Sequence, residues 1–263
     1  MSMKRSGWQL FGMQTAFALV CGGALACTQP SEPQTLRVFA ASSLVDAFDA
    51  IKENFLATHP GVDVRLVYAG SQVLRAQIEQ GAQVDVFASA HRRDLDRLKS
   101  QNLVVEPTEF AKNRLVLLCR RTPACEQLTW KNLSQVKRIG LGLAATPVGH
   151  YTERVLELGA QRFGASWAED VRERVVTQEA QVRRLRARVE LGVLDAAIVY
   201  QSDVTDETTY RGIRPPAELD QFTELWVARG QNTANTDLAQ AWIDGLSSLE
   251  GQRLLKAHGL EVR

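Results

Sequence analysis

The first third of the chain alternates between short, mostly apolar runs and amphipathic stretches. Residues 36–41 form such a run and residues 62–68 alternate apolar and polar positions, so both are predicted to be strands. Between them, apolar side chains recur at helical spacing, at Leu44, Phe48, Ile51 and Phe55. A helix at 72–80, a buried strand at 84–88 and a charged helix at 92–100 complete a β-α-β-α-β-α order. That order predicts a parallel sheet covered by helices.

The same alternation returns in the middle of the chain. Strands are predicted at 114–119, 138–143 and 194–200, and helices at 130–136, 146–159, 166–175, 182–190, 237–248 and 250–258. We therefore expect an α/β fold of two lobes, each a mainly parallel sheet flanked by helices, with the ligand in the cleft between them. Lobe one is expected to comprise residues 36–112 and 202–263, and lobe two residues 113–201.

The N-terminus is predicted to be a targeting segment. Lys4 and Arg5 precede an uncharged stretch that ends in small residues at Ala26, so residues 1–26 are interpreted as a signal peptide rather than a retained transmembrane anchor. Cys27 follows directly, as in bacterial lipoproteins that are lipidated on this thiol; ordinary cleavage after Ala26 is the alternative. Either route places the protein in the periplasm or cell envelope, and residues 27–35 are interpreted as a tether.

Composition and charge narrow the class of protein. Apolar residues make up 45% of the chain and charged residues 23%, which is typical of a soluble globular protein. Subtracting the two positive charges of Lys4 and Arg5 from the net charge of +1 leaves a body of net charge −1. A near-neutral body argues against a nucleic-acid partner.

Two cysteines are expected to pair in the mature protein. Cys119 and Cys125 enclose a short loop, and an extracytoplasmic location permits disulfides, so a disulfide is predicted there; two buried thiols are the alternative. No histidine or further cysteine stands at metal-ligand spacing beside them, so no metal-cation site is predicted.

Two serines mark the ends of predicted strands. Ser43 and Ser71 each follow a strand-like run and precede a helix, where a hydroxyl and free backbone N–H groups meet the positive end of the helix dipole. Taken singly, a serine at such a position is more often a plain helix N-cap than an anion ligand. Together they predict one anion held from several sides.

Catalytic motifs are not found in the sequence. It contains no Gly-x-Ser-x-Gly elbow and no phosphate-binding loop, which lowers the expectation of an enzyme; a hydrolase that uses Ser43 remains an alternative. Tyr200 ends an apolar strand and is by itself a typical core tyrosine. The arginines at 183–188 are interpreted as a solvated helix face paired with acids such as Glu190, the alternative being steering of an anion or nucleic acid.

Taken in order, these segments resemble the molybdate-binding component of bacterial molybdate ABC transporters. The resemblance covers residues 36–263. The matching stretches are VFAASSLVDAF (38–48), AGSQVL (69–74), QIEQGA (77–82), DVFASA (85–90), NRLVL (113–117), PVGHY (147–151), QVR (181–183) and AIVYQSD (197–203).

The resemblance implies a two-lobed periplasmic binding protein that closes on one molybdate or tungstate ion and delivers it to a membrane ABC permease. It implies no enzymatic activity, no cofactor, a monomer, and no membrane contact beyond a lipid anchor. The positions that match the family's ligands are Ser43 and Ser71 by hydroxyl and backbone N–H, Val148 and Val182 by backbone N–H, and Tyr200 by hydroxyl.

Departures from the family pattern concern the anion preference. Val148 stands where a small residue is expected, and His150 beside it either faces solvent or tunes binding with pH. The alternatives are a receptor of the same fold for sulfate, phosphate or an organic anion, and an accessory lipoprotein with an inactive cleft.

Overall fold

The structure is a computed structural model that describes residues 34–262. The predicted signal peptide, Cys27 and the tether up to residue 33 lie outside the described residues. The last two tether positions, Gln34 and Thr35, are already part of the first strand. Within the described range, no helix combines the length and apolar character needed to cross a bilayer.

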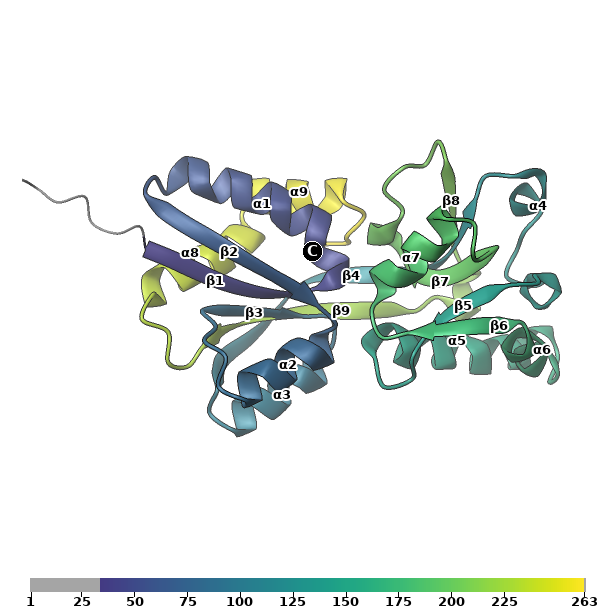
Figure 1. Ribbon diagram of the computed structural model, residues 1–263, viewed down its shortest axis with the longest axis horizontal. Coiled ribbons are helices and arrows are strands. Elements are labelled where there is room, and N and C mark those ends of the chain that lie inside the picture. The colour runs from purple at the N-terminus through teal and green to yellow at the C-terminus, as the bar shows by residue number, and fades with distance from the viewer. Residues whose placement is uncertain (1–33, 263) are drawn as a thin grey trace, which may run out of the picture. The chain divides into compact units, whose positions relative to one another are not determined.

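The first lobe contains the elements at both ends of the described chain (Figure 1). Its strands are β1 (Gln34–Ala41), β2 (Val62–Ala69), β3 (Val86–Ser89), the first part of β4 (Val104–Arg120) and β9 (Phe222–Gly230). Its helices are the 3₁₀ turn η1 (Ser42–Leu44), α1 (Val45–Thr58), α2 (Ser71–Glu79), α3 (Arg92–Ser100), α8 (Thr236–Ser247) and α9 (Leu249–Ala257).

The second lobe is built from the middle of the chain (Figure 1). Its strands are the end of β4, β5 (Ile139–Gly142), β6 (Val175–Glu179), β7 (Ala196–Tyr200) and β8 (Tyr210–Ile213). Its helices are α4 (Pro123–Glu126), η2 (Leu133–Gln135), α5 (Pro147–Phe163), α6 (Trp167–Glu173), α7 (Val182–Glu190), η3 (Gln201–Asp203) and η4 (Ala217–Leu219).

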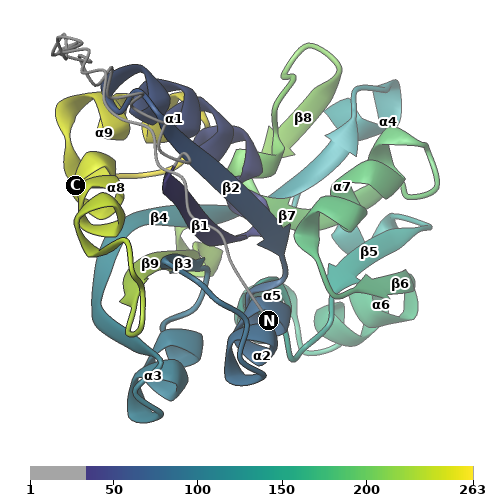
Figure 2. The ribbon, with the colours of Figure 1, turned by 60° about the vertical axis from the view of Figure 1, so that its left-hand side comes forward.

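The strands of both lobes are hydrogen-bonded in the order β2-β1-β3-β9-β4-β7-β5-β6, with β8 on β4. β1 pairs in parallel with β2 and β3, and β5 in parallel with β6 and β7. β4 joins the lobes: residues up to Arg114 pair with β9, and residues from Leu115 pair antiparallel with β7. Figure 2 shows β4 running from the first lobe toward the second. The carboxyl ends of β1, β2, β5 and β6 lead directly into η1, α2, α5 and α7.

Each lobe has its own core. In the first, α1, α8 and α9 cover one face of the sheet, where Trp242 packs edge-on against Phe48 with ring centroids 5.7 Å apart, and α2 and α3 cover the other. In the second, one continuous core joins β4, β5 and β7 to α5, α6 and α7. Cys119 and Cys125 form a disulfide within it, with Cα atoms 5.9 Å apart.

The second crossing between lobes differs from the sequence prediction. Residues 202–221 were assigned to lobe one, but β8 pairs with β4 beyond the crossing and Leu219 is buried in the second core. The chain returns only with β9, whose first residue, Phe222, pairs with Arg114. The polar segment after β7 shows little hydrophobic periodicity. Its position is set by the pairing of β8 with β4, which is distant in the sequence. Lobe two therefore extends to about residue 221.

Two predicted helices are also corrected. The helix expected at 130–136 is only the single turn η2, and α6 ends at Glu173 because residues from Val175 form β6. Asn132 explains the first case: its side chain accepts from the N–H of Thr129 at 2.7 Å, a local bond that competes with helix formation.

Candidate functional site

The five residues singled out in the sequence line one cavity between the lobes. Ser43 lies in η1 after β1, and Ser71 is the first residue of α2 after β2. Val148 lies in the first turn of α5, and Val182 is the first residue of α7. Tyr200 ends β7. The cavity measures about 20 Å³, which is room for one small solute.

Two hydroxyl groups at this cavity have no partner. Ser43 Oγ and Tyr200 Oη are buried, and no group in residues 34–262 meets the geometry of a hydrogen bond to either. Thr223 is the neighbour of Tyr200 that comes nearest to it, and the Thr223 hydroxyl itself donates to the carbonyl of Ala90. A buried polar group without a partner carries a desolvation cost of about 1–3 kcal/mol, so native structures rarely contain one without a reason. Both groups line the same small space, which indicates a ligand that accepts hydrogen bonds.

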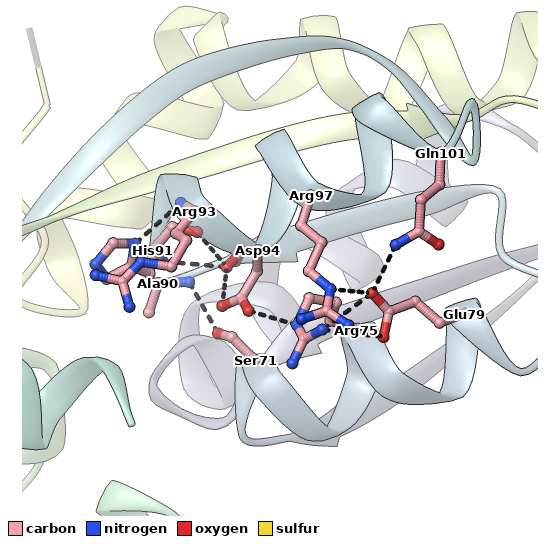
Figure 3. Close-up of polar contacts among 10 residues, drawn as sticks. Ser71, Arg75, Glu79, Ala90, His91, Arg93, Asp94, Arg97 and Gln101 are labelled. Carbon is pink, nitrogen blue, oxygen red and sulfur yellow. Dashed lines mark hydrogen bonds and ion pairs between the residues drawn. The ribbon is translucent and has the colours of Figure 1, made fainter. Parts of the chain in front are cut away.

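Ser71 is oriented by a backbone group. Its Oγ accepts a hydrogen bond from the N–H of Ala90 at 3.0 Å, so its own proton is left to donate elsewhere. Figure 3 shows this contact and the ion pairs that fix α2 against α3 behind it. Arg75 donates to Asp94 at 2.9 Å and to Glu79 at 3.0 Å. Burial raises the pKa of Asp94, and the Arg75 charge opposes that rise.

Helix starts supply backbone donors from both lobes. Among the described residues, no side chain caps the start of α2 or α7, so first-turn N–H groups there are available to a ligand. α5 begins differently: Thr146 Oγ1 accepts from the N–H of Gly149 at 3.2 Å. A Cβ on Gly149 would lie 1.9 Å from the carbonyl oxygen of Leu143, so the tight turn into α5 requires glycine.

Val148 has a structural counterpart in Gly142. A Cβ on Gly142 would come within 2.5 Å of Val148 Cγ1. The larger side chain at 148 is therefore accommodated by the absence of one at 142, and Val148 lines the cavity.

The electrostatics of the cavity are those of neutral donors. None of the described residues that line it carries a formal charge. Burial raises the pKa of Tyr200 well above its ordinary value, with smaller contributions from Tyr151 and Asp203 and opposition from Thr223. The phenol therefore stays protonated and can donate. Within residues 34–262 no group of three or more His, Cys, Asp or Glu side chains could hold a metal cation.

Two residues that hold the site, Ser202 and Asn113, were not singled out in the sequence, whereas Gln72, beside Ser71, was expected as a polar wall of the site. Ser202 Oγ donates to the carbonyl of Ser43 at 3.0 Å and accepts from Asn113 Nδ2 at 2.8 Å, so η3 and β4 fix the turn that carries Ser43. Gln72 Nε2 donates to the carbonyl of Ala180 at 3.2 Å, across the cleft. The sequence carries no signal for Asn113, because nothing in it shows that this side chain is buried.

His150 faces solvent and also meets a residue of the other lobe. Its side chain is on the exposed face of α5, yet its ring centroid lies 5.4 Å from that of His91, the N-cap of α3. Burial lowers the pKa of His91, with further lowering by Arg93 and His150. The two histidines thus form part of the contact between the lobes.

The chain is similar to known proteins in sequence and in fold. Residues 36–261 match the model of the family described as bacterial extracellular solute-binding protein. The molybdate-binding protein ModA of Mycobacterium tuberculosis is 29% identical over 257 residues, which covers 94% of each chain. The periplasmic molybdate-binding protein of Azotobacter vinelandii superimposes with a TM-score of 0.75 at 19% identity, covering 87% of this chain and 99% of that one. The sulfate-binding protein SubI of M. tuberculosis gives 0.73 at 15%, covering 86% of each.

Proposed function

The chain belongs to the family of bacterial extracellular solute-binding proteins, and we propose that its solute is molybdate or tungstate, delivered to a membrane ABC permease. Membership of this family makes the protein a receptor rather than an enzyme. The fold is shared with receptors for different anions, so the choice of anion must come from the cavity.

The observation that carries the proposal is the pair of unpartnered hydroxyls, Ser43 Oγ and Tyr200 Oη. Both can donate, and Ser71 has a free hydroxyl proton beside them. A buried anion requires several donors and no facing lone pairs. We assign the remaining donors to the backbone N–H groups of Val148 and Val182, two residues that line the same cavity.

A dianion is compatible with this uncharged wall. The starts of α2, α5 and α7 each present the positive end of a helix dipole, which substitutes for a buried lysine or arginine. Small volume disfavours organic anions. Molybdate and tungstate are favoured over sulfate because the similarity to ModA extends over nearly the whole chain. The bonds from molybdenum or tungsten to oxygen are also longer than those in sulfate. Donors spaced for the larger anion would make longer and weaker hydrogen bonds to sulfate.

The experiment is a calorimetric titration of the mature protein with molybdate, tungstate, sulfate and phosphate. The proposal expects one-to-one binding of the first two and much weaker binding of the others. Preference for sulfate or phosphate would keep the receptor and overturn the choice of anion. No heat with any of the four would leave the oxyanion proposal without support.

Attachment and location follow from the N-terminal sequence. We also propose that Cys27 is lipidated and that the protein is located at the cell envelope, because the receptor must meet its permease at the membrane. Mass spectrometry of the mature protein and of Cys27→Ala tests this: a lipid-sized mass difference is expected, and identical processing of the two would exclude lipidation.

A further inference from the structure

An ion pair joins α1 of the first lobe to α7 of the second, beside the cavity. Asp46 lies in the first turn of α1, three residues after Ser43, and Arg183 follows Val182 at the start of α7. Arg183 Nη1 donates to Asp46 Oδ2 at 2.9 Å and Nη2 donates to Oδ1 at 3.4 Å, a two-pronged contact. Arg186 stands behind it, with Nη1 at 3.6 Å from the same carboxylate.

These contacts join two helices of different lobes, whereas Arg114, the other residue that links the lobes by ion pairs within 34–262, lies on β4 at the crossing itself and pairs with Asp220 and Glu261. Pairs such as Arg75–Asp94 and Arg188–Glu179 lie within one lobe. Among the ion pairs formed between residues 34 and 262, those of Asp46 link a helix of the first lobe to a helix of the second. Opening the cleft would separate these helices and break the pair.

The pair is partly shielded from water. The side chains of Arg183 and Asp46 are 28% and 31% exposed, and that of Arg186 is 19% exposed. A two-pronged arginine–carboxylate contact at this burial is stronger than a free surface pair, although solvent still screens it.

Further polar groups surround the pair. Arg186 Nε donates to Glu190 at 2.6 Å, and the buried carboxylate of Asp203 lies near both arginines. Tyr68 donates to Asp49 at 2.8 Å on the first-lobe side. Neither arginine lines the anion cavity, so the group acts on the geometry of the lobes and not on the anion directly.

We propose that Asp46 and Arg183 form a latch that stabilises the closed arrangement of the lobes and so determines affinity without touching the anion. The inference rests on the proposed function only for the identity of the anion. Apparent affinity scales with the closed fraction, so weakening the latch must weaken binding and speed release. Arg186 supports the latch from behind.

The test combines a measurement without anion with a double-mutant cycle. The variants are Asp46→Asn, Arg183→Gln and the double variant, with Arg188→Gln as the matched control because its pair with Glu179 lies within one lobe. Small-angle scattering of the anion-free proteins should show a larger radius of gyration for Asp46→Asn than for the wild type and the control. Equal radii would overturn the proposal, even if none of the four oxyanions bound.

Stopped-flow and calorimetric measurements with molybdate give the second readout. Each single variant should lose about fivefold to tenfold in affinity for molybdate, mainly through faster dissociation. The affinity of the double variant should be no lower than that of the single variant that binds molybdate more weakly. Losses that multiply in the double variant would show that the residues act separately. A slower association with unchanged dissociation would indicate anion steering and would also overturn the latch. If the wild type bound none of the oxyanions, the proposed function would be refuted, and the scattering result would decide whether the latch exists.

Discussion

The hydroxyl oxygen of Ser71 accepts a hydrogen bond from the backbone N–H of Ala90 at 3.0 Å. Ala90 follows β3 and Ser71 follows β2, so two strand ends of the first lobe together set the direction of one donor. The hydroxyl proton of Ser71 is not used in this bond, so it is available to donate to the proposed anion.

Removing this hydroxyl should weaken anion binding strongly. Ser71→Ala deletes a donor to a charged acceptor and leaves the Ala90 N–H unpaired, so a loss of about tenfold to a hundredfold in affinity for molybdate is expected. Ser100→Ala, at an exposed serine whose hydroxyl donates to the carbonyl of Arg97, is the control. Equal affinities for Ser71→Ala and the control, measured by calorimetry, would contradict this role.

Tyr200→Phe should separate affinity from stability. The hydroxyl has no partner among the described residues, so its removal should leave the anion-free protein at least as stable as before, while affinity falls about tenfold or more. Chemical denaturation with and without molybdate measures both quantities. A variant that loses stability and keeps affinity would show that the hydroxyl is structural.

Stability should depend on pH through Asp203. Burial raises its pKa to about 7, against the Tyr200 N–H and the charges of Arg183 and Arg186. The folded protein then holds a proton that the unfolded chain has released above pH of about 4, so stability from this group is lost as pH rises from about 4 to about 7. The loss is at most about 4 kcal/mol.

Asp203→Asn isolates this effect. The amide oxygen can still accept from the Tyr200 N–H, the bond that Asp203 Oδ2 makes at 3.2 Å. The free energy of unfolding of the variant should therefore lose this downward slope between pH 4 and 7. An unchanged difference between variant and wild type across that range would exclude titration of Asp203.

His91 should act in the opposite direction. Its pKa is lowered, mainly by burial and then by Arg93 and His150, while Glu224 and Asp96 oppose the change. As pH falls through about 6.5, the histidine is therefore protonated in the unfolded state before it is protonated in the folded state. This lowers the free energy of unfolding. His91→Asn keeps a helix-capping side chain and should remove this loss between pH 7.5 and 5.5 in urea unfolding. A loss that persists in the variant belongs to another group.

The disulfide should contribute to stability but not to binding. Cys119 and Cys125 are six positions apart, and closing so short a loop stabilises the folded state by about 2 kcal/mol. The double variant Cys119→Ala, Cys125→Ala should lose about that much in denaturant unfolding and keep its affinity for molybdate. A large loss of affinity would place this end of the second lobe in the binding mechanism.

The strand-to-helix junctions could be predicted from the sequence because their signals are local. Ser43 and Ser71 each follow an apolar run and begin an apolar helical stripe, and the structure has both at helix starts. The same local reasoning reaches α7, whose first residue is Val182 as predicted.

Non-local pairings account for what the sequence did not reveal. β9 lies between β3 and β4 although more than a hundred residues separate it from these strands, and β8 is held by the edge of β4. The basic run on α7 was interpreted as a solvated face; Arg186 does pair with Glu190, but Arg183 reaches Asp46, 137 positions away. Only the folded arrangement of the lobes brings these groups together.

Diffraction from crystals grown with molybdate tests the central claim most directly, because molybdenum can be located by its anomalous scattering. We predict one strong anomalous peak in the cavity, with oxygen atoms within hydrogen-bond distance of Ser43 Oγ and Tyr200 Oη. The peak should be absent from crystals of the Ser43→Ala, Tyr200→Phe double variant grown at the same low molybdate concentration. A peak elsewhere on the protein, or none in the wild-type cavity, would contradict the assignment of this site.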